Sequence, residues 1–394
     1  MTDKKTLASK KRVAFVASGG AVKAACFHVG VCLALQEKGF SFSGGLKNSS
    51  FKSTPSNRPR IDIYVGSSAG ALITTLLASG HSLSRIIKSF SKANKVSSAE
   101  KPLPKIGYLD IFHPAALHFI NPFRRSKIHK RGWETIKGHL FLRGLFTTKG
   151  LEKYLRTKIL PTLSFNELAP DLNIVATQLD YSQKTVFGKK KGYSEEHACL
   201  YTDDIAISDA VAASTSLPPF FTPYRLTHQN KETIHYFDGE IRQTLSTHVA
   251  KDSGADLIIA SYTHQPYHYT PEIGSLMNQG ISYITVQALY QCIEQKIATS
   301  KSIHDNKELV LSTVDRFFRD ENLPSDKRKN LVLLLEEKME YSRDLDYIFI
   351  HPQPDDYEMF FGDHFNLSAK VMDQAVRIGF KSAINALRKY SLES

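Results

Sequence analysis

Two short apolar runs, each followed by glycines and a helical pattern, stand in the first 80 residues. Residues 13–17 (VAFVA) and 61–65 (IDIYV) are partly β-branched, which is typical of strands buried in a parallel sheet. Apolar positions then recur at helical spacing over residues 24–36, where Gly39 marks a stop, and over residues 69–78. This order predicts two units of strand, glycine turn and helix.

The same alternation continues along the chain. Further strands are predicted at residues 173–177, 236–237, 257–262 and 347–350, and helices within 208–219, within 270–340 and at 367–387. Residues 41–60 are rich in Ser, Gly, Asn, Lys and Pro, which predicts a surface loop. Strands that alternate with helices predict a mostly parallel sheet covered by helices on both faces.

Composition and charge narrow the class of protein. Of the 394 residues, 42% are hydrophobic and 23% are charged, which excludes a disordered chain, collagen and a coiled coil. Lys and Arg number 51 against 39 Asp and Glu, a net charge of +12. Residues 121–158 hold eleven basic and two acidic side chains (+9), and residues 1–12 hold five and one (+4). The charge is therefore regional and favours an anionic partner: nucleic acid, a lipid surface or an acidic substrate.

Neither a secretion signal nor a transmembrane helix is predicted. Residues 13–35 follow basic residues as a signal would, but Lys23 and His28 interrupt them. Residues 63–83 lack Asp, Glu, Lys and Arg, yet they contain too many Ser, Thr and Gly residues for a span. The cysteines are scattered and form no C-x-x-C pair, which favours a reducing, cytoplasmic compartment over a disulfide framework or a zinc site. They are Cys26, Cys32, Cys199 and Cys292.

Residues 66–70 have the G-x-S-x-G spacing of a nucleophile elbow and stand between a predicted strand and helix. A serine at so tight a turn sits in strained backbone, and Gly66 and Gly70 leave room for neighbouring main chain. The following helix aims free amides and its positive end at the serine. Ser68, rather than Ser67, is therefore the predicted nucleophile. The alternative is a small-residue turn needed only for packing.

Two other segments supply the groups that a nucleophilic serine needs. Residues 18–23 (SGGAVK) place backbone amides at a helix N-terminus, which fits an oxyanion pocket or a phosphate site. Asp238 ends a short apolar strand and precedes Gly239, so it is the candidate general base; an Asx turn is the alternative.

Histidines downstream of Asp238 would suit a conventional triad order, but none has local sequence support. They are His248, His264, His268, His304, His351 and His364. Pro266 lies between His264 and His268 and spoils a helical metal pair, so no metal site is expected.

The three segments, in this order, resemble the patatin-like phospholipase family over roughly residues 12–260, and more loosely at 346–352 and in the last helix. The family's oxyanion loop G-G-G-x-[KR]-G matches residues 19–24 (GGAVKA), and its elbow matches residues 66–70. Its D-G-[GA] motif matches Asp238 and Gly239, with Glu240 in place of the small residue.

The resemblance implies an α/β three-layer sandwich with a mostly parallel central sheet and added helical segments. It implies a Ser68–Asp238 dyad with an oxyanion hole and supporting residues. The hole corresponds to Gly19, Gly20 and Ala21, and the supporting positions to Lys23, Gly66, Gly70 and Gly239.

The function implied is a serine lipid acyl hydrolase of the phospholipase A or esterase type. It would cleave fatty-acyl esters of membrane or storage lipids through an acyl-enzyme, without a cofactor. A catalytically weak lipid-binding or regulatory protein is the alternative, because Glu240 and the alanines at positions 21 and 24 depart from the motifs. A nucleic-acid binder has no RNA-recognition, zinc-finger or helix-turn-helix signature to support it. The oligomeric state stays open.

The departures from the motifs have physical consequences. Ala21 and Ala24 keep their amide donors, but an alanine at a position that needs positive φ is strained by about 1 kcal/mol. Glu240 raises the pKa of Asp238 if both carboxyl groups point inward, and has little effect if it faces solvent.

The expected organisation has four parts. They are a basic tail (1–12), a core (13–262) with a basic helical insertion at about 102–161, a helical insertion or extension (263–345), and a strand and helix (346–394) that complete the core. Basic residues of 121–158 interleave with Trp133 and phenylalanines, which predicts peripheral contact with an anionic membrane; a solvated helix face is the alternative.

Overall fold

The structure is a computed structural model of the chain. It describes residues 5–48, 58–90, 100–115, 145–218, 220–242, 244–322, 324–339, 341–362 and 365–392. Most of the segment 121–158, with Trp133, and His364 lie outside these ranges.

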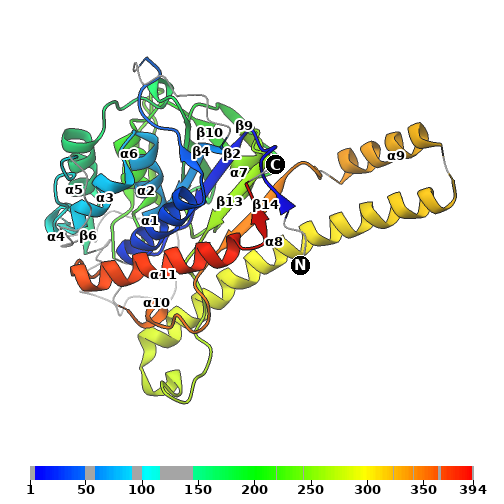
Figure 1. The fold of residues 1–394 in the computed structure, drawn as a ribbon. Coiled ribbons are helices and arrows are strands. Elements are labelled where there is room, and N and C mark those ends of the chain that lie inside the picture. Colours follow the sequence, from blue (N-terminus) through cyan, green and yellow to red (C-terminus); the bar gives the residue numbers. More distant parts are fainter. Residues whose placement is uncertain are drawn as a thin grey trace, which may run out of the picture.

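A mostly parallel sheet of eleven strands forms the centre of the molecule (Figure 1). Its order is β14-β13-β2-β4-β7-β8-β10-β9; β3 pairs with β4, and β12 joins β7 and β11. The run from β14 to β7 is parallel throughout, which confirms the predicted sheet type. The strands are β2 (Val13–Ala17), β3 (Ser41–Phe42), β4 (Arg60–Ser67), β7 (Asp171–Gln178), β8 (Lys184–Phe187), β9 (Gly192–Ser194), β10 (Cys199–Thr202), β11 (Tyr224–Thr227), β12 (Thr233–Asp238), β13 (Leu257–Ser261) and β14 (Asp346–Ile350).

Two further strand pairs lie outside this sheet. β1 (Lys5–Thr6) pairs with β15 (Tyr390–Ser391), and β5 (His113–Pro114) pairs with β6 (Phe146–Thr147). The helices are α1 (Ala21–Glu37), α2 (Ala69–Ala78), α3 (Leu83–Phe90), α4 (Tyr108–Ile111), α5 (Lys149–Tyr154), α6 (Ile207–Ser214), α7 (Thr247–Asp252), α8 (Ile281–Asp320), α9 (Ser325–Lys338), α10 (Glu358–Phe361) and α11 (Ala369–Leu387), with short η1 (Leu155–Ile159), η2 (Phe165–Glu167) and η3 (Leu276–Asn278).

Helices cover both faces of the sheet. Since the side chains of a strand alternate between its faces, the neighbours of successive β2 residues show which helices lie on each face. On β2, Val13 and Phe15 join the apolar cluster that contains α1, α2 and α11. Ala14 and Val16 join the second cluster, with residues of α7 and α8. Since β2 is buried at every position, its continuous apolar run is explained by helices on either side. The predicted α/β sandwich is confirmed.

Two glycines bring α1 and α11 close together. A Cβ atom on Gly30 would lie 2.0 Å from the carbonyl oxygen of Val376, and one on Gly379 would lie 2.1 Å from that of Phe27. No side chain fits at either crossing. The last helix is therefore packed on the helix that follows the glycine loop of residues 18–23.

The helices α8 and α9 extend away from the sheet (Figure 1). α8 spans 40 residues. Ile293 and Ile297, in its first half, pack in the second apolar cluster, and the helix then continues outward to the turn into α9. The predicted helical character of residues 270–340 is confirmed. Among the described residues, no helix combines the length and apolar character that crossing a membrane requires.

The predicted elements agree closely with the observed ones. α2 has the predicted bounds, and α1 begins at Ala21, three residues before the periodic pattern. Gly39, at φ 105°, follows the end of α1 as expected. The surface loop predicted at residues 41–60 contains the short strand β3, and strands β8 to β11 have no counterpart among the predictions.

Candidate active site

Ser68 occupies the corner between β4, which ends at Ser67, and α2, which begins at Ala69. Its backbone has φ 51° and ψ −123°, a strained conformation for a residue with a side chain. A Cβ atom on Gly66 would lie 2.4 Å from Thr74 Oγ1, and one on Gly70 would lie 2.1 Å from the carbonyl oxygen of Ala17. The turn therefore has no room for side chains at the two glycine positions.

A serine of helix α6 fastens this turn to the sheet. The backbone N–H of Ser68 donates to Ser214 Oγ at 2.9 Å, and Ser214 Oγ donates to the carbonyl oxygen of Val175 on β7 at 2.6 Å. Ser214 is fully buried. Ser214 thereby provides a hydrogen-bond acceptor for the Ser68 backbone N–H at the strained corner.

Asp238 ends β12 and lies beside Ser68. β12 pairs with β7, and β7 pairs with β4, so the ends of three adjacent strands bring the two residues together. Asp238 is 1% exposed, and its carboxylate accepts a hydrogen bond from the backbone N–H of Glu240 at 2.9 Å and interacts with the Ser68 side chain. Burial raises the pKa of Asp238 to about 6, against the opposing effect of these interactions.

The glycine loop before α1 approaches Ser68 from the neighbouring strand β2. A Cβ atom on Gly19 would lie 2.9 Å from Ser68 Cβ. Gly20 has φ 127° and Ala21 has φ 60°, so the alanine at position 21 occupies a conformation that costs about 1 kcal/mol for a residue with a side chain. Ala24 lies within α1 and has no such strain. The first-turn amides of α1 have no intrahelical acceptor.

A buried histidine supports this loop from behind. His28 Nε2 contacts the carbonyl oxygen of Ser18 at 2.9 Å, and Nδ1 contacts Ser261 Oγ at 2.7 Å. Burial lowers the pKa of His28 to about 4, so the imidazole is neutral at pH 7. The side chain of Thr263 donates to the carbonyl oxygen of Gly19 at 3.2 Å. The loop is thus tied to the end of β13.

Glu240 points into the site rather than into solvent. Its Oε1 accepts a hydrogen bond from the Gly19 N–H at 3.0 Å and another from the Ser67 hydroxyl. Burial and the neighbouring Asp238 raise the pKa of Glu240 to about 8. The inward arrangement considered from the sequence is therefore the one found, and Glu240 shows the larger upward shift of the two carboxyl groups.

The motif residues Lys23 and Gly239 have structural roles. Lys23 is buried, and its Nζ donates to the carbonyl oxygens of Met359 and Gly362, the latter at 3.3 Å, so it connects α1 to the α10 turn. A Cβ atom on Gly239 would lie 2.3 Å from the carbonyl oxygen of Val175, which leaves only glycine at that position.

Four of the downstream histidines have contacts away from Ser68 and Asp238. His248 contacts Lys184 Nζ at 2.5 Å, His264 packs edge-on against Tyr290, and His351 stacks on Tyr262. His304 packs against Tyr341 and Tyr347. In the described part of the chain, no group of three or more His, Cys, Asp or Glu residues is placed to hold a metal ion.

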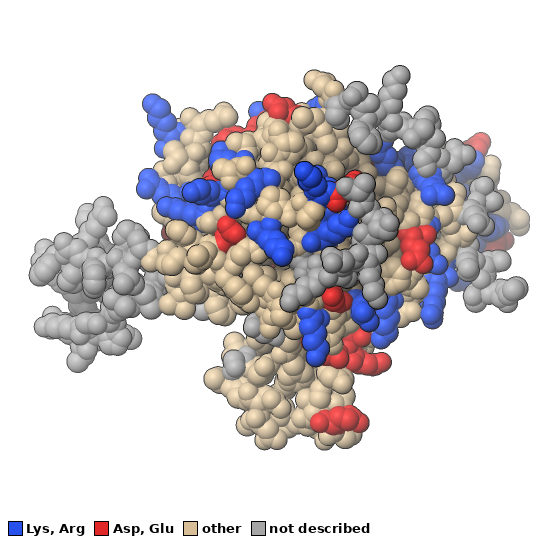
Figure 2. Space-filling view, turned by 60° about the vertical axis from the view of Figure 1, so that its left-hand side comes forward, with Lys and Arg blue, Asp and Glu red and all other residues tan. Residues whose placement is uncertain are grey.

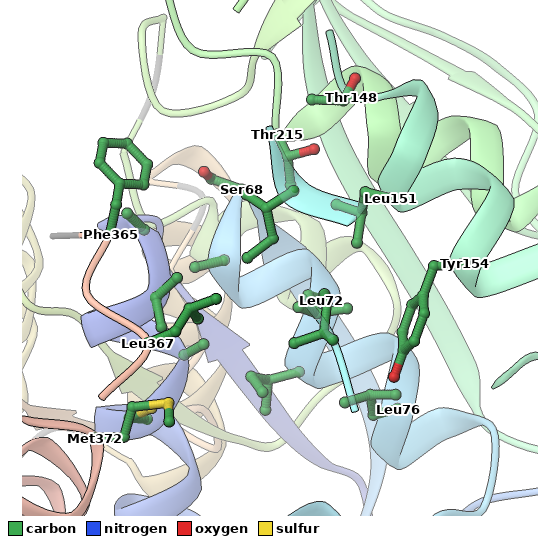
Figure 3. A pocket seen from close by; sticks show the side chains of 18 of the residues that line it. Ser68, Leu72, Leu76, Thr148, Leu151, Tyr154, Thr215, Phe365, Leu367 and Met372 are labelled. Carbon is green, nitrogen blue, oxygen red and sulfur yellow. The ribbon is translucent and has the colours of Figure 1, made fainter. Parts of the chain in front are cut away.

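An apolar cavity begins at Ser68 and runs along α2 (Figure 3). Leu72 and Leu76 line it on the α2 side, and Leu151 and Tyr154 of α5 face them. Its described lining contains no Asp, Glu, Lys, Arg or His. Phe365 lies near Ser68, and Tyr154 lies farther along beside Leu76 (Figure 3). A reactive serine thus opens onto space suited to a hydrocarbon chain.

Comparison with known proteins agrees with this arrangement. A family model described as patatin-like phospholipase matches residues 15–251, more than half of the chain. The chain belongs to the patatin-like phospholipase family. Membership supports lipid acyl hydrolase activity in general, with lipids as substrates.

Two residues at the site of this patatin-like phospholipase were not predicted as site residues. Ser214 lies in the small-residue helix expected within residues 208–219, but nothing in that segment marks one serine over another. In the sequence, His28 appears only as a polar residue within an apolar helix. Its place among apolar residues, which indicates burial, was the available signal. Both act through contacts between segments far apart in sequence.

We expect Ser214→Ala to reduce the reactivity of Ser68. The substitution leaves the Ser68 N–H without its acceptor, at a cost of about 1–3 kcal/mol in unfolding free energy. Ser208→Ala is the matched control, because Ser208 is on the same helix, is fully buried and donates to Glu152 at 2.9 Å. Denaturant unfolding and the rate of labelling by a fluorophosphonate probe measure the two effects. Both variants should lose stability, and equal labelling rates in the two would contradict a role for Ser214 at the elbow.

Proposed function

We propose that this protein is a serine lipid acyl hydrolase of the phospholipase A or esterase type, with Ser68 as nucleophile and Asp238 as general base. The observation that carries the proposal is the strained Ser68, next to a buried Asp238 whose pKa it lowers, at the end of an apolar cavity. Acyl esters of membrane or storage lipids have the matching chemistry: a reactive carbonyl attached to a hydrocarbon chain.

In the proposed reaction, Asp238 takes the hydroxyl proton of Ser68 as the oxygen attacks the ester carbonyl. The raised pKa of Asp238, about 6, makes it a better base than an exposed aspartate and still leaves it ionised at pH 7. The proton then passes to the departing alcohol. Water attacks the acyl-enzyme in a second step, with Asp238 again as base, and releases the fatty acid.

The negative charge of the tetrahedral intermediate requires donors beside Ser68. The amide of Gly19 already donates to Glu240, so we place the oxyanion against the amides of Gly20 and Ala21. Ala21 begins α1, whose positive end favours an anion at this position. The cost of the positive φ at Ala21 is small against the effect of one such donor, which is about 10² to 10³ in rate.

We also infer peripheral contact with an anionic membrane through the basic residues of 121–158. Of that stretch, the structure describes 145–158, where Lys149 and Lys153 are exposed on α5 and Arg156 pairs with Glu152 and Asp209. Figure 2 shows Lys and Arg side chains outnumbering Asp and Glu on one face of the molecule. Leu145, within this segment, has an exposed apolar side chain, as does Leu109 of α4, whose carbonyl oxygen would lie 2.8 Å from a Cβ atom on Gly150.

The organisation into parts is likewise our proposal. β14 pairs with β13 and α11 packs on α1, which supports assigning residues 346–394 to the core with residues 13–262. The extension of α8 and α9 beyond the sheet supports treating residues 263–345 as an added helical part (Figure 1).

Substitutions at the dyad test the proposed chemistry directly. Ser68→Ala and Asp238→Asn should each lower the turnover of a fatty-acyl ester by at least about 10³-fold, because each removes a group that acts in the bond-making step. Ser67→Ala should retain most activity, and wild-type turnover should fall as pH drops below about 6, where Asp238 becomes protonated. If the wild type is folded but neither hydrolyses the ester nor is labelled by a fluorophosphonate probe, the result supports the catalytically weak lipid-binding alternative instead.

The cavity predicts the preference for acyl-chain length. Leu76 lies eight residues after Ser68, so at 1.5 Å per residue it lines the cavity about 12 Å along α2. Leu76→Trp should reduce hydrolysis of a palmitoyl ester about tenfold or more and leave that of a butyryl ester nearly unchanged. The volume-conserving Leu76→Met is the control. Equal losses for both esters would show that the acyl chain lies elsewhere.

Charge reversal tests the membrane contact. Lys149→Glu together with Lys153→Glu should weaken binding to phosphatidylserine vesicles about 30-fold or more, since each basic residue near such a surface contributes about 1 kcal/mol and the new glutamates are repelled. Lys327→Glu with Lys329→Glu on α9 makes the same charge change at a distance and should bind as the wild type does. If cosedimentation with vesicles does not depend on salt concentration or on the charge of the lipids, the contact is ruled out.

A further inference from the structure

One residue contacts all three segments of the proposed site. The backbone N–H of Glu240 donates to Asp238 Oδ1 at 2.9 Å. Its Oε1 accepts from the Gly19 N–H of the glycine loop at 3.0 Å and from the Ser67 hydroxyl of the elbow. These segments come from different parts of the chain and meet only in the folded protein. Within residues 238–240, only Glu240 reaches both others through its side chain.

Packing around this contact is tight. A Cβ atom on Gly19 would lie 2.8 Å from Glu240 Cγ and 2.9 Å from Ser68 Cβ, so the main chain of Gly19 is held between the glutamate and the nucleophile. Gly239, which has no room for a side chain against Val175, fixes the turn from which Glu240 projects. The position of Glu240 therefore determines how close the glycine loop lies to Ser68.

We propose that Glu240 is a positioning residue of the hydrolytic site, a neutral carboxylic acid that fastens the glycine loop and the elbow to the Asp238 turn. The inference rests on the proposed function, since it assigns Glu240 a part in the reaction of Ser68. Glu240 does not touch the reacting atoms. It holds the Gly19 loop, and with it the adjacent amides of Gly20 and Ala21, at the distance that the oxyanion requires.

The surroundings favour the neutral form. Glu240 is buried, its Oε2 has neither water contact nor a hydrogen-bond partner among the described residues, and the one charged group that acts on it in that part of the chain is Asp238, two residues away. Two carboxylates in one buried site cannot both be ionised cheaply, so one keeps its proton. Asp238, which accepts the backbone N–H of Glu240, is the one that ionises first, since its pKa is about 6 and that of Glu240 about 8.

Ionisation of Glu240 should slow the reaction. A second negative charge beside Asp238 opposes the charge that develops on the substrate oxygen, and it acts through a buried site where screening is weak. Activity should therefore decline above about pH 8, where Glu240 loses its proton. A residue that only fills space would give no such dependence.

Two substitutions separate these roles. Glu240→Gln keeps an oxygen that accepts both hydrogen bonds and cannot ionise. It should keep kcat within about threefold of the wild type at pH 7 and should lose the alkaline decline. Glu240→Ala removes the side-chain contacts and leaves the backbone donor to Asp238. It should lower kcat by about 10 to 10²-fold with little change in KM, because the oxyanion donors are no longer held in place.

The experiment measures kcat and KM for a short-chain fatty-acyl ester from pH 5 to pH 10, with thermal unfolding recorded for each variant. Ser68→Ala reports on the proposed function and Glu195→Gln, an exposed acid remote from the site, is the control for losing a carboxylate. A wild type without Ser68-dependent hydrolysis would overturn both the function and the inference. An active wild type whose alkaline decline persists in Glu240→Gln would overturn the inference alone. So would a folded Glu240→Ala variant with wild-type kcat.

Discussion

The backbone of Ser68 is the constraint on which the rest of the site depends. A residue with a side chain is held at φ 51°, in a conformation that costs on the order of 1–3 kcal/mol and persists only where the surroundings determine it. Gly66 and Gly70 permit the close approach of main chain on either side. Val175 of β7 then supports both halves of the dyad: its carbonyl oxygen accepts from Ser214, which binds the Ser68 amide, and it packs against Gly239 beside Asp238. One position on a central strand thus sets the nucleophile and the base relative to each other.

Burial decides how much charge this arrangement tolerates. Asp238 and Glu240 are both buried, and His28 behind the glycine loop is neutral at pH 7 because its pKa is about 4. The cavity beyond Ser68 adds no charged side chain from its described lining. With so little screening, a single ionised carboxylate has a strong effect on any charge that develops nearby. The same burial that lifts the pKa of Asp238 toward the range of a useful base also raises the pKa of Glu240 to about 8, which favours its protonated form at pH 7.

Local patterns in the sequence were sufficient for the framework but not for these couplings. The buried strands and α2 follow from apolar periodicity, and the elbow follows from five residues in a strand-to-helix context. Strands β8 to β11 are short, and several alternate half-exposed positions, so they leave weak signals. The direction of Glu240 was not predictable, because the chain leaves β12 at Asp238 and the alternation of a strand no longer applies. Positive φ at Ala21 is normally marked by glycine, which is absent there.

The basic character of the chain and the apolar cavity meet on one short helix. On α5, Lys149 and Lys153 are exposed while Leu151 and Tyr154 line the cavity, since helical periodicity sends neighbouring residues to different faces. The cavity wall and a positively charged surface are therefore two sides of the same element. Under the proposed membrane contact, a lipid whose anionic head group lay at Lys149 and Lys153 would be within one helix diameter, about 10–12 Å, of the cavity that ends at Ser68. This geometry places two of the chain's basic side chains beside the proposed reaction, which composition alone does not provide.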